Sequence, residues 1–185
     1  YLPDLAGGPA EAVSLRQLLS HSSGYSTRQG NVDHDSTDAS ETVLRDTVTE
    51  MAAWQPDHEP GQSWAYSNAN YLILGAVIEA VTGRSYADYV EREILTPLGM
   101  DNSHVADGTA HPDMAVPHVP WFRGWRAVDE AGRDRLYAPA GGVIASARDL
   151  ALYLGMMLNG QDDLISAEHK TPIAAPKMAK PPFCR

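Results

Sequence analysis

One apolar segment in the middle of the chain constrains the fold more than any other part of the sequence. It runs from Asn70 to Thr82, its one charged residue is Glu79, and Gly83 follows it. A helix that is apolar on nearly every side has to be buried all round, and glycine commonly ends helices in the left-handed conformation. The sequence therefore predicts a buried central helix, around which the rest of the unit packs.

Shorter helices are predicted on both sides of this segment. Ser14 with Gln17, and Ser146 with Asp149, have the spacing of capping boxes, in which two side chains satisfy the free amides of a first helical turn. Apolar residues at helical spacing support a helix over 40–54, and Ser85 caps a further helix that stops at Thr96 and Pro97. The expected ranges are 15–21, 40–54, 86–95 and 147–158.

A single β-hairpin is predicted in the second half of the chain. Residues 121–128 and 133–138 flank the sequence Asp-Glu-Ala-Gly, in which Gly132 takes the left-handed turn position. Residues 101–120 show no periodicity and are expected to be a loop. The fold class expected from the sequence is therefore mainly α with a small β-hairpin.

One folded unit is expected over 1–160, followed over 161–185 by a polar, Pro-, Lys- and Ala-rich tail that is weakly ordered. A chain of 185 residues can build a core without disulfides, and Cys184 has no partner for one. The net charge of −10 argues against a nucleic-acid partner. The longest apolar stretch, 71–78, is far shorter than the roughly 18 residues of a membrane span.

Three stretches carry the residues that bear most on function. They are VSLRQLLSHSSG at 13–24, PG at 60–61 leading through YSN at 66–68 to PLGM at 97–100, and PAGG at 139–142 leading into SARDL at 146–150. In this order and spacing they resemble the serine β-lactamase and penicillin-binding-protein-like hydrolases. That family includes class C β-lactamases, D-Ala-D-Ala carboxypeptidases, D-aminopeptidases and esterases, and the resemblance covers about 1–160.

The resemblance implies acyl transfer to a serine. In the family the serine of an S-x-x-K motif attacks a carbonyl, the lysine helps to take its proton, and a K-T-G or H-x-G strand closes the pocket. The YSN sequence matches the family's Y-x-N element. Tyr66 would then act as general acid/base, and Asn68 would hydrogen-bond the carbonyl or amide of the substrate.

The other two family motifs have no counterpart in the chain. No lysine has a serine three places before it, and the KT sequence at 170–171 is followed by Pro172, where K-T-G requires glycine. The resemblance places S-x-x-K before Tyr1 and the closing strand after Arg185. We expect the chain to be the helical region of a β-lactamase/transpeptidase-like α+β fold, without most of the antiparallel sheet, and inactive alone.

Ser67 and Asn68 have a second interpretation, because both residue types cap helices by accepting hydrogen bonds from first-turn amides. Gly141 and Gly142 predict a tight turn beside the substrate pocket. The capping and catalytic interpretations of Asn68 are compatible with each other. We include the two glycines among the candidate substrate-binding residues because of their place in the third stretch.

Arg123 and Trp125, in the predicted hairpin, are further candidates for substrate binding, because arginine pairs well with a carboxylate. Arginines and aromatic residues together also suit nucleic-acid binding, but acidic residues interleave with them here. Histidines at 104, 111 and 118 would share one face only on a continuous helix, which the prolines between them forbid. No metal site and no cofactor is predicted.

The leading functional interpretation is a segment of a serine hydrolase that acts on a small-molecule amide or ester. A β-lactam, a D-amino-acid peptide and an ester all remain open as substrates, because Y-S-N is compatible with each. The alternative is a non-catalytic binding or scaffold module of the same fold. The missing N- and C-terminal segments would be the partners of the chain in the first case, and the compartment is left open in both.

Overall fold

The computed structural model describes residues 1–31, 40–107, 109, 113–128, 135–158 and 164–166. Helix α4, Asn68–Thr82, lies at its centre and ends at Gly83, whose φ of 68° is left-handed as predicted. The first turns of α4 are buried, but Val81 near its end is 63% exposed. The central helix is confirmed, although burial on every side holds only for its N-terminal part.

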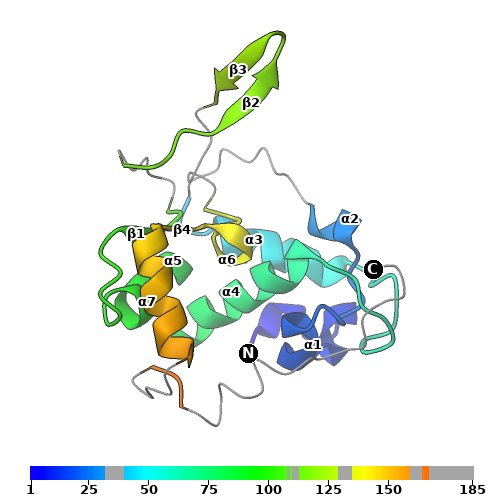
Figure 1. Ribbon diagram of the computed structural model, residues 1–185. Coiled ribbons are helices and arrows are strands. Elements are labelled where there is room, and N and C mark those ends of the chain that lie inside the picture. The colour runs from blue at the N-terminus through cyan, green and yellow to red at the C-terminus, as the bar shows by residue number, and fades with distance from the viewer. Residues whose placement is uncertain (32–39, 108, 110–112, 129–134, 159–163, 167–185) are drawn as a thin grey trace.

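The remaining helices are short, and several of them pack on α4 (Figure 1). In chain order they are η1 Pro3–Leu5, η2 Pro9–Ala12, α1 Leu15–Leu19, α2 Thr27–Gly30, α3 Val43–Glu50, η3 Met51–Ala53, α5 Tyr86–Val90, the π-helical turn η4 Glu91–Leu95, α6 Ala138–Gly141 and α7 Ala147–Leu158. The capping box of α1 forms as predicted, with Ser14 and Gln17 bonding each other's backbone amides. A second capping box, Ser26 with Gln29, starts α2, a helix that the sequence analysis did not identify.

Buried side chains form two clusters. The larger one surrounds the N-terminal half of α4 and joins it to α1, α3 and the first residues of the chain; among its members are Leu18, Tyr25, Leu44, Val48, Met51, Leu72 and Ile73. The smaller one lies where α5, η4 and α6 meet the β-strand at 103–105; among its members are Ala87, Val90, Leu95, Val105 and Ala138. In the larger cluster, Leu44, Val48 and Met51 are the residues whose helical spacing predicted the helix over 40–54.

Two small antiparallel sheets complete the structure. Strand β1, Ser103–Val105, pairs with β4, Val143–Ala145, and β2, His118–Trp121, pairs with β3, Gly124–Ala127. The first pair was not expected, because its strands are three residues long and far apart in the sequence, so neither shows an alternating pattern. It falls partly within the region interpreted as a loop.

The predicted pairing of 121–128 with 133–138 is wrong where the structure describes it, because the observed hairpin pairs β2 with β3 and residues 135–138 form no strand. Residues 121–128 were expected to form one strand; instead the chain reverses at Phe122 and Arg123, and Trp121 pairs with Gly124. Residues 129–132, the expected turn, lie outside the described residues, and Ala138 begins helix α6 rather than continuing a strand. Alternation alone does not locate a turn, and a two-residue loop satisfies the same pattern.

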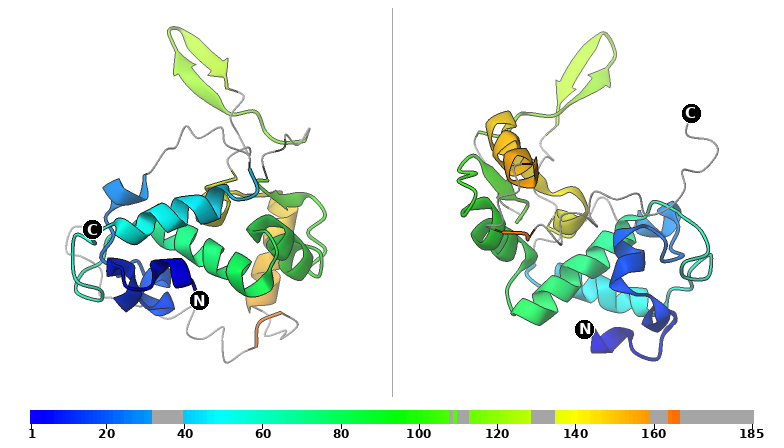
Figure 2. Two further views of the ribbon diagram at one scale, coloured as in Figure 1. Left: turned by 180° about the vertical axis from the view of Figure 1, so that it is seen from behind. Right: turned by 60° about the horizontal axis from the view of Figure 1, so that its bottom comes forward.

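This hairpin is exposed along its whole length (Figures 1 and 2). Phe122 is 99% exposed and has a φ of 46°, an uncommon conformation for a non-glycine residue. The guanidinium of Arg126 lies over the ring of Trp121, 5.4 Å from its centre.

None of the helices in the described part of the chain combines the length and the apolar character that a membrane span needs.

The second predicted capping box forms only in part. Ser146 Oγ accepts a hydrogen bond from the Asp149 amide, but Asp149 Oδ2 accepts bonds from the Asn102 amide and the Ser103 hydroxyl, each at 2.8 Å. Burial raises the pKa of Asp149, yet hydrogen bonds from Ser103, Asn102 and Ser146 and the nearby Arg148 charge outweigh burial and leave this pKa below its ordinary value. The carboxylate therefore ties α7 to the start of β1.

The depressed pKa of Asp149 predicts an acid-dependent loss of stability. A carboxyl group with a lowered folded-state pKa stabilises the fold above its ordinary value of 3.8, and this contribution disappears as pH falls through the folded-state pKa. We expect Asp149→Asn to lower the urea midpoint near neutral pH and to flatten its fall between pH 4 and about pH 2. The exposed Asp57→Asn is the control; equal pH dependence in wild type and Asp149→Asn would contradict the assignment.

Gly75 sets the distance between α4 and α6. A Cβ atom added to Gly75 would lie 2.7 Å from Cβ of Pro139 and 3.2 Å from Cδ2 of Leu44. Gly75→Ala gains about 1 kcal/mol of helix propensity, but overpacking a rigid proline ring costs more. We expect a net destabilisation of about 2 kcal/mol in thermal or urea unfolding. Gly141→Ala, where the added Cβ meets nothing within 4 Å, should change stability by less than about 0.5 kcal/mol.

Candidate active site

Tyr66 and Asn68 lie side by side at the start of α4. Ser67 between them is the N-cap residue and has an extended backbone, with φ of −152°, so its two neighbours point to the same side of the chain. The Tyr66 hydroxyl donates a hydrogen bond of 2.8 Å to Asn68 Oδ1. The Tyr66 side chain is 47% exposed, which leaves the phenol accessible to a molecule arriving from solvent.

The same hydrogen bond fixes the orientation of the Asn68 amide. Because Oδ1 accepts from the phenol, the Nδ2 group faces away from it and donates to Asn31 Oδ1 at 3.4 Å. Ser67, in contrast, makes no capping bond; its hydroxyl is fully buried and has no hydrogen-bond partner among the described residues. The structure therefore gives the Asn68 side chain a bond with Tyr66 rather than with the helix amides.

His21 supports the tyrosine from the side. Its ring centre lies 4.8 Å from that of Tyr66 and 5.2 Å from that of Tyr71, so the imidazole sits between two phenol rings. His21 Nδ1 accepts a hydrogen bond of 3.3 Å from the Ser67 amide and lies 3.0 Å from Asn70 Nδ2. His21 adopts a φ of 54°, a left-handed conformation that costs a histidine free energy and is found where the surroundings enforce it.

A buried hydrogen-bond chain settles the protonation of this histidine. The Ser23 hydroxyl donates to Asn70 Oδ1 at 2.6 Å, so the Asn70 amide group is the donor toward His21. Nδ1 of His21 accepts from both the Ser67 amide and the Asn70 side chain, which places the ring proton on Nε2. Burial lowers the pKa of His21 and so favours this neutral form.

Backbone contacts join the loop before α4 to the HSSG sequence. The Ala65 amide donates to the His21 carbonyl at 3.0 Å, and the Gly61 amide donates to the Ser22 carbonyl at 2.7 Å. From the other side, Gly30 of α2 approaches closely: a Cβ on it would lie 2.6 Å from Ser67 Oγ. Two motifs that are far apart in the sequence therefore form one local structure around Tyr66.

The other candidate residues lie elsewhere. Arg123 and Trp125 belong to the exposed hairpin, which projects from the rest of the molecule in each view (Figures 1 and 2). Gly141 closes α6, and Gly142 allows tight packing there, because a Cβ on it would lie 2.6 Å from Ala138 Cα. The structure brings Tyr66 and Asn68 together, and among the described residues no hydrogen bond or ring contact joins either of them to Arg123, Trp125, Gly141 or Gly142.

The described residues contain no cluster of three or more His, Cys, Asp or Glu side chains that could hold a metal ion. His104 lies in β1 and His118 in β2, which belong to different sheets, and position 111 lies outside the described residues. The network around Tyr66 is made of hydroxyl, amide and imidazole groups. Its chemistry is therefore that of hydrogen bonding and proton transfer.

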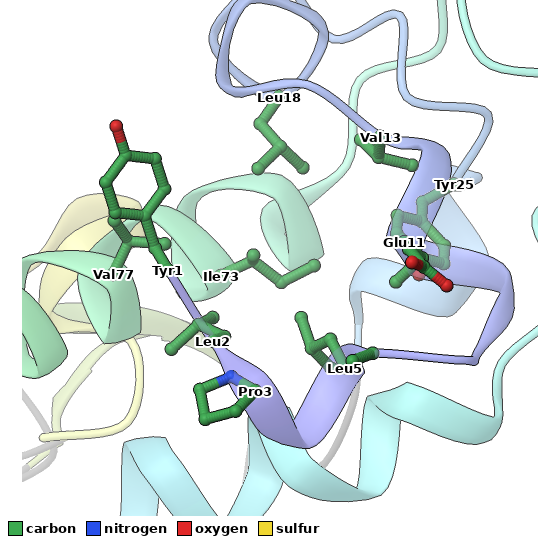
Figure 3. Close-up of a pocket in the computed structure, with 12 residues that line it drawn as sticks. Tyr1, Leu2, Pro3, Leu5, Glu11, Val13, Leu18, Tyr25, Ile73 and Val77 are labelled. Atoms are coloured by element: carbon green, nitrogen blue, oxygen red, sulfur yellow. The ribbon is translucent and has the colours of Figure 1, made fainter.

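A cavity of about 390 Å³ lies in another part of the molecule (Figure 3). Its walls are mostly apolar and come from the N-terminal residues, α1 and α4; Leu2, Leu5, Leu18 and Ile73 face one another across it, with Glu11 at one end. Neither Tyr66 nor Asn68 lines it. The candidate active site around Tyr66 therefore lies outside this cavity.

Several residues of the site were not singled out from the sequence. His21 and Ser23 belong to the first stretch, but nothing in the sequence connects them to Tyr66. In the sequence, Asn70 is simply the first residue of the apolar segment. The Thr27 hydroxyl donates a hydrogen bond of 2.6 Å to the Tyr66 carbonyl, and no sequence motif points to Thr27. One available signal was Asn70, because a polar residue within a buried helix needs hydrogen-bond partners.

Comparison with known proteins connects this site to a family. A family model described as beta-lactamase matches residues 1–183. A penicillin-binding protein of Bacillus subtilis is 31% identical over 113 residues, which make up 59% of this chain and 25% of that protein. A D-stereospecific amidohydrolase from a Streptomyces species has a TM-score of 0.71 at 26% identity, over 95% of this chain and 55% of that one.

A penicillin-binding protein of Bacillus halodurans has the same TM-score of 0.71 at 23% identity, over 96% of this chain and 57% of that one, and this likeness concerns the fold. The chain thus spans a quarter of the Bacillus subtilis relative and slightly more than half of the two solved chains. The family match covers nearly every residue, including the three stretches that carry the resemblance. The chain belongs to the serine β-lactamase and penicillin-binding-protein-like family.

Proposed function

We propose that this chain forms part of a serine hydrolase that makes an acyl-enzyme with a β-lactam, a D-amino-acid peptide or an ester. Tyr66 is its general acid/base, and Asn68 binds the carbonyl or amide of the substrate. The observation that carries this proposal is the 2.8 Å bond between the half-exposed Tyr66 hydroxyl and Asn68 Oδ1. A phenol and an amide held together in this way present a proton-transfer group beside a hydrogen-bonding group.

The proposed roles follow from the order of proton transfers in acyl transfer. When a serine hydroxyl attacks a carbonyl, its proton has to move to a base, and the leaving group has to receive a proton. A tyrosine serves as that base near neutral pH only where neighbouring cations stabilise its phenolate. The 185 residues contain no S-x-x-K, so we assign the serine and the lysine to a segment outside them.

The greater length of the relatives supports the assignment of the serine and the lysine to another segment. Because the chain spans 55% of the Streptomyces amidohydrolase and 25% of the Bacillus subtilis penicillin-binding protein, each relative has substantial additional sequence. We propose that 1–160 is the helical region of the domain and that most of the antiparallel sheet is contributed by the N- and C-terminal segments. The tail expected over 161–185 lies outside the described residues, except for 164–166.

The surface of α7 is consistent with a missing layer. Leu150, Leu154 and Leu158 are 48%, 56% and 81% exposed and recur every four residues, so they form an apolar stripe along one side of the helix. Such stripes on soluble proteins usually mark a surface that another element covers. The sheet of the complete protein is the covering element that we propose.

A non-catalytic binding or scaffold module is the second candidate function. The absence of S-x-x-K from the 185 residues favours it, because the fold and the Tyr66 network would persist without a nucleophile. The two candidates differ in what the complete coding sequence contains. A serine and a lysine in S-x-x-K spacing upstream of Tyr66 support the hydrolase, and a complete sequence without them leaves the scaffold.

The hydrolase proposal predicts that the 185-residue chain does not turn over substrate. The chain and the complete protein would be assayed against a chromogenic cephalosporin and a short-chain nitrophenyl ester. We expect an acylation burst from the complete protein only, because the nucleophile is assigned to the other segment. Turnover by the chain itself would show that another residue acts as nucleophile and would refute the assignment.

The role of Tyr66 predicts a strong effect of removing one oxygen atom. In the complete protein, Tyr66→Phe should lower kcat by at least about a hundredfold, the usual contribution of a general acid/base, with little change in unfolding temperature. The control is Tyr153→Phe on α7, a partly exposed tyrosine outside the site. A kcat for Tyr66→Phe within threefold of wild type would rule out general acid/base catalysis by this phenol.

A further inference from the structure

The peptide group that links Tyr66 to Ser67 is held at both of its polar atoms by side chains from other elements. Its carbonyl oxygen accepts a hydrogen bond of 2.6 Å from the Thr27 hydroxyl, at the start of α2. Its N–H donates to His21 Nδ1 at 3.3 Å, in the turn after α1. This peptide precedes the first residue of α4, so the helix itself does not hold its carbonyl.

The two side chains are themselves held in place. Thr27 is the first residue of a helix whose capping box, Ser26 with Gln29, fixes its backbone, and Gln29 Nε2 also donates to the Gln55 carbonyl at 2.7 Å. Nδ1 of His21 also receives a bond from Asn70, whose side chain is fully buried. The left-handed φ of His21, 54°, directs the imidazole at this peptide at a cost in backbone free energy.

Tyr66 needs this external support, because few other contacts restrain it. Its side chain is 47% exposed, and among the described residues its partners are the His21 ring, 4.8 Å away between ring centres, and Asn68 at the hydroxyl. A half-exposed side chain keeps one position only if its backbone is fixed, because rotation of the peptide plane moves the phenol oxygen by ångströms. Displacement of a reacting group by about 1 Å can reduce a rate a hundredfold.

We propose that Thr27 and His21 are positioning residues, which clamp the Tyr66–Ser67 peptide from both sides and thereby hold the Tyr66 hydroxyl in place for proton transfer. Neither residue touches the reacting atoms. The catalytic part of this proposal rests on the function proposed above for Tyr66, whereas the clamp itself concerns the structure of the chain. Among the described residues, the phenols in ring contact with His21 are those of Tyr66 and Tyr71.

Thr27 provides the sharper test, because it is exposed and can change without disturbing the core. Thr27→Val removes the hydroxyl and keeps the shape, and Thr27→Ser restores a hydroxyl. In the complete protein we expect Thr27→Val to lower kcat about tenfold with KM within about twofold, and Thr27→Ser to recover most of the loss. Thr49→Val is the matched control, because the exposed Thr49 hydroxyl also donates to a backbone carbonyl, that of Arg45, at 2.9 Å but away from the site.

A second readout uses the 185-residue chain and does not depend on activity. Hydrogen exchange of the Ser67 amide, measured by NMR, should be at least about tenfold faster in Thr27→Val than in wild type or Thr49→Val, because one side of the clamp is open. His21→Asn keeps a side-chain acceptor and tolerates a positive φ, so it should protect the Ser67 amide better than His21→Phe, which keeps only a ring.

The two readouts separate failure of the clamp from failure of the proposed function. If Tyr66→Phe lowers kcat and Thr27→Val leaves kcat within twofold of wild type, the clamp does not position the phenol and the inference is wrong. If Tyr66→Phe has no effect on kcat, the proposed function fails and the exchange rates alone decide the clamp. Equal exchange of the Ser67 amide in Thr27→Val and Thr49→Val overturns the clamp.

Discussion

A buried amide connects the core of this protein to its candidate active site. Asn70 is fully buried in the N-terminal turns of α4, where a polar side chain without hydrogen bonds would cost about 1–3 kcal/mol. Its oxygen is satisfied by Ser23 and its nitrogen by His21. Because these partners come from the residues in the turn after α1, burial of α4 also fixes the position of that turn. His21, in the same turn, accepts a hydrogen bond from the Ser67 amide and so holds the backbone next to Tyr66.

The position of Tyr66 depends on close backbone packing as much as on hydrogen bonds. Gly30 allows α2 to reach the start of α4, and Gly75 allows α6 to pack against its middle. A side chain at either position would push a neighbouring element away, because the added Cβ would lie within 3 Å of that element. The sequence around the site is therefore constrained in two ways: polar groups must be paired, and some positions must lack a Cβ.

The sequence predicted the helices better than the β-structure, for a physical reason. Helices such as α4 and α7 repeat an apolar pattern over three or more turns, and Ser14 and Gly83 mark helix ends by local chemistry. Strands β1 and β4 are three residues long and pair across about forty residues of chain, so no local pattern identifies either one. A hairpin was predicted over 121–138, but the observed one lies at 118–127, and its turn at Phe122 and Arg123 lacks the usual turn residues.

The sequence by itself determined the central helix and placed Tyr66 and Asn68 in one Y-x-N element, because each depends on residues close together in the chain. The family resemblance came from the order and spacing of three stretches, which are also read directly from the sequence. Only the tertiary structure decided that the HSSG turn and Thr27 surround Tyr66, and that the hairpin with Arg123 and Trp125 projects elsewhere. Contacts between segments about forty residues apart arise from packing on a shared core. That packing depends on the shapes of all the helices together, which no single motif contains.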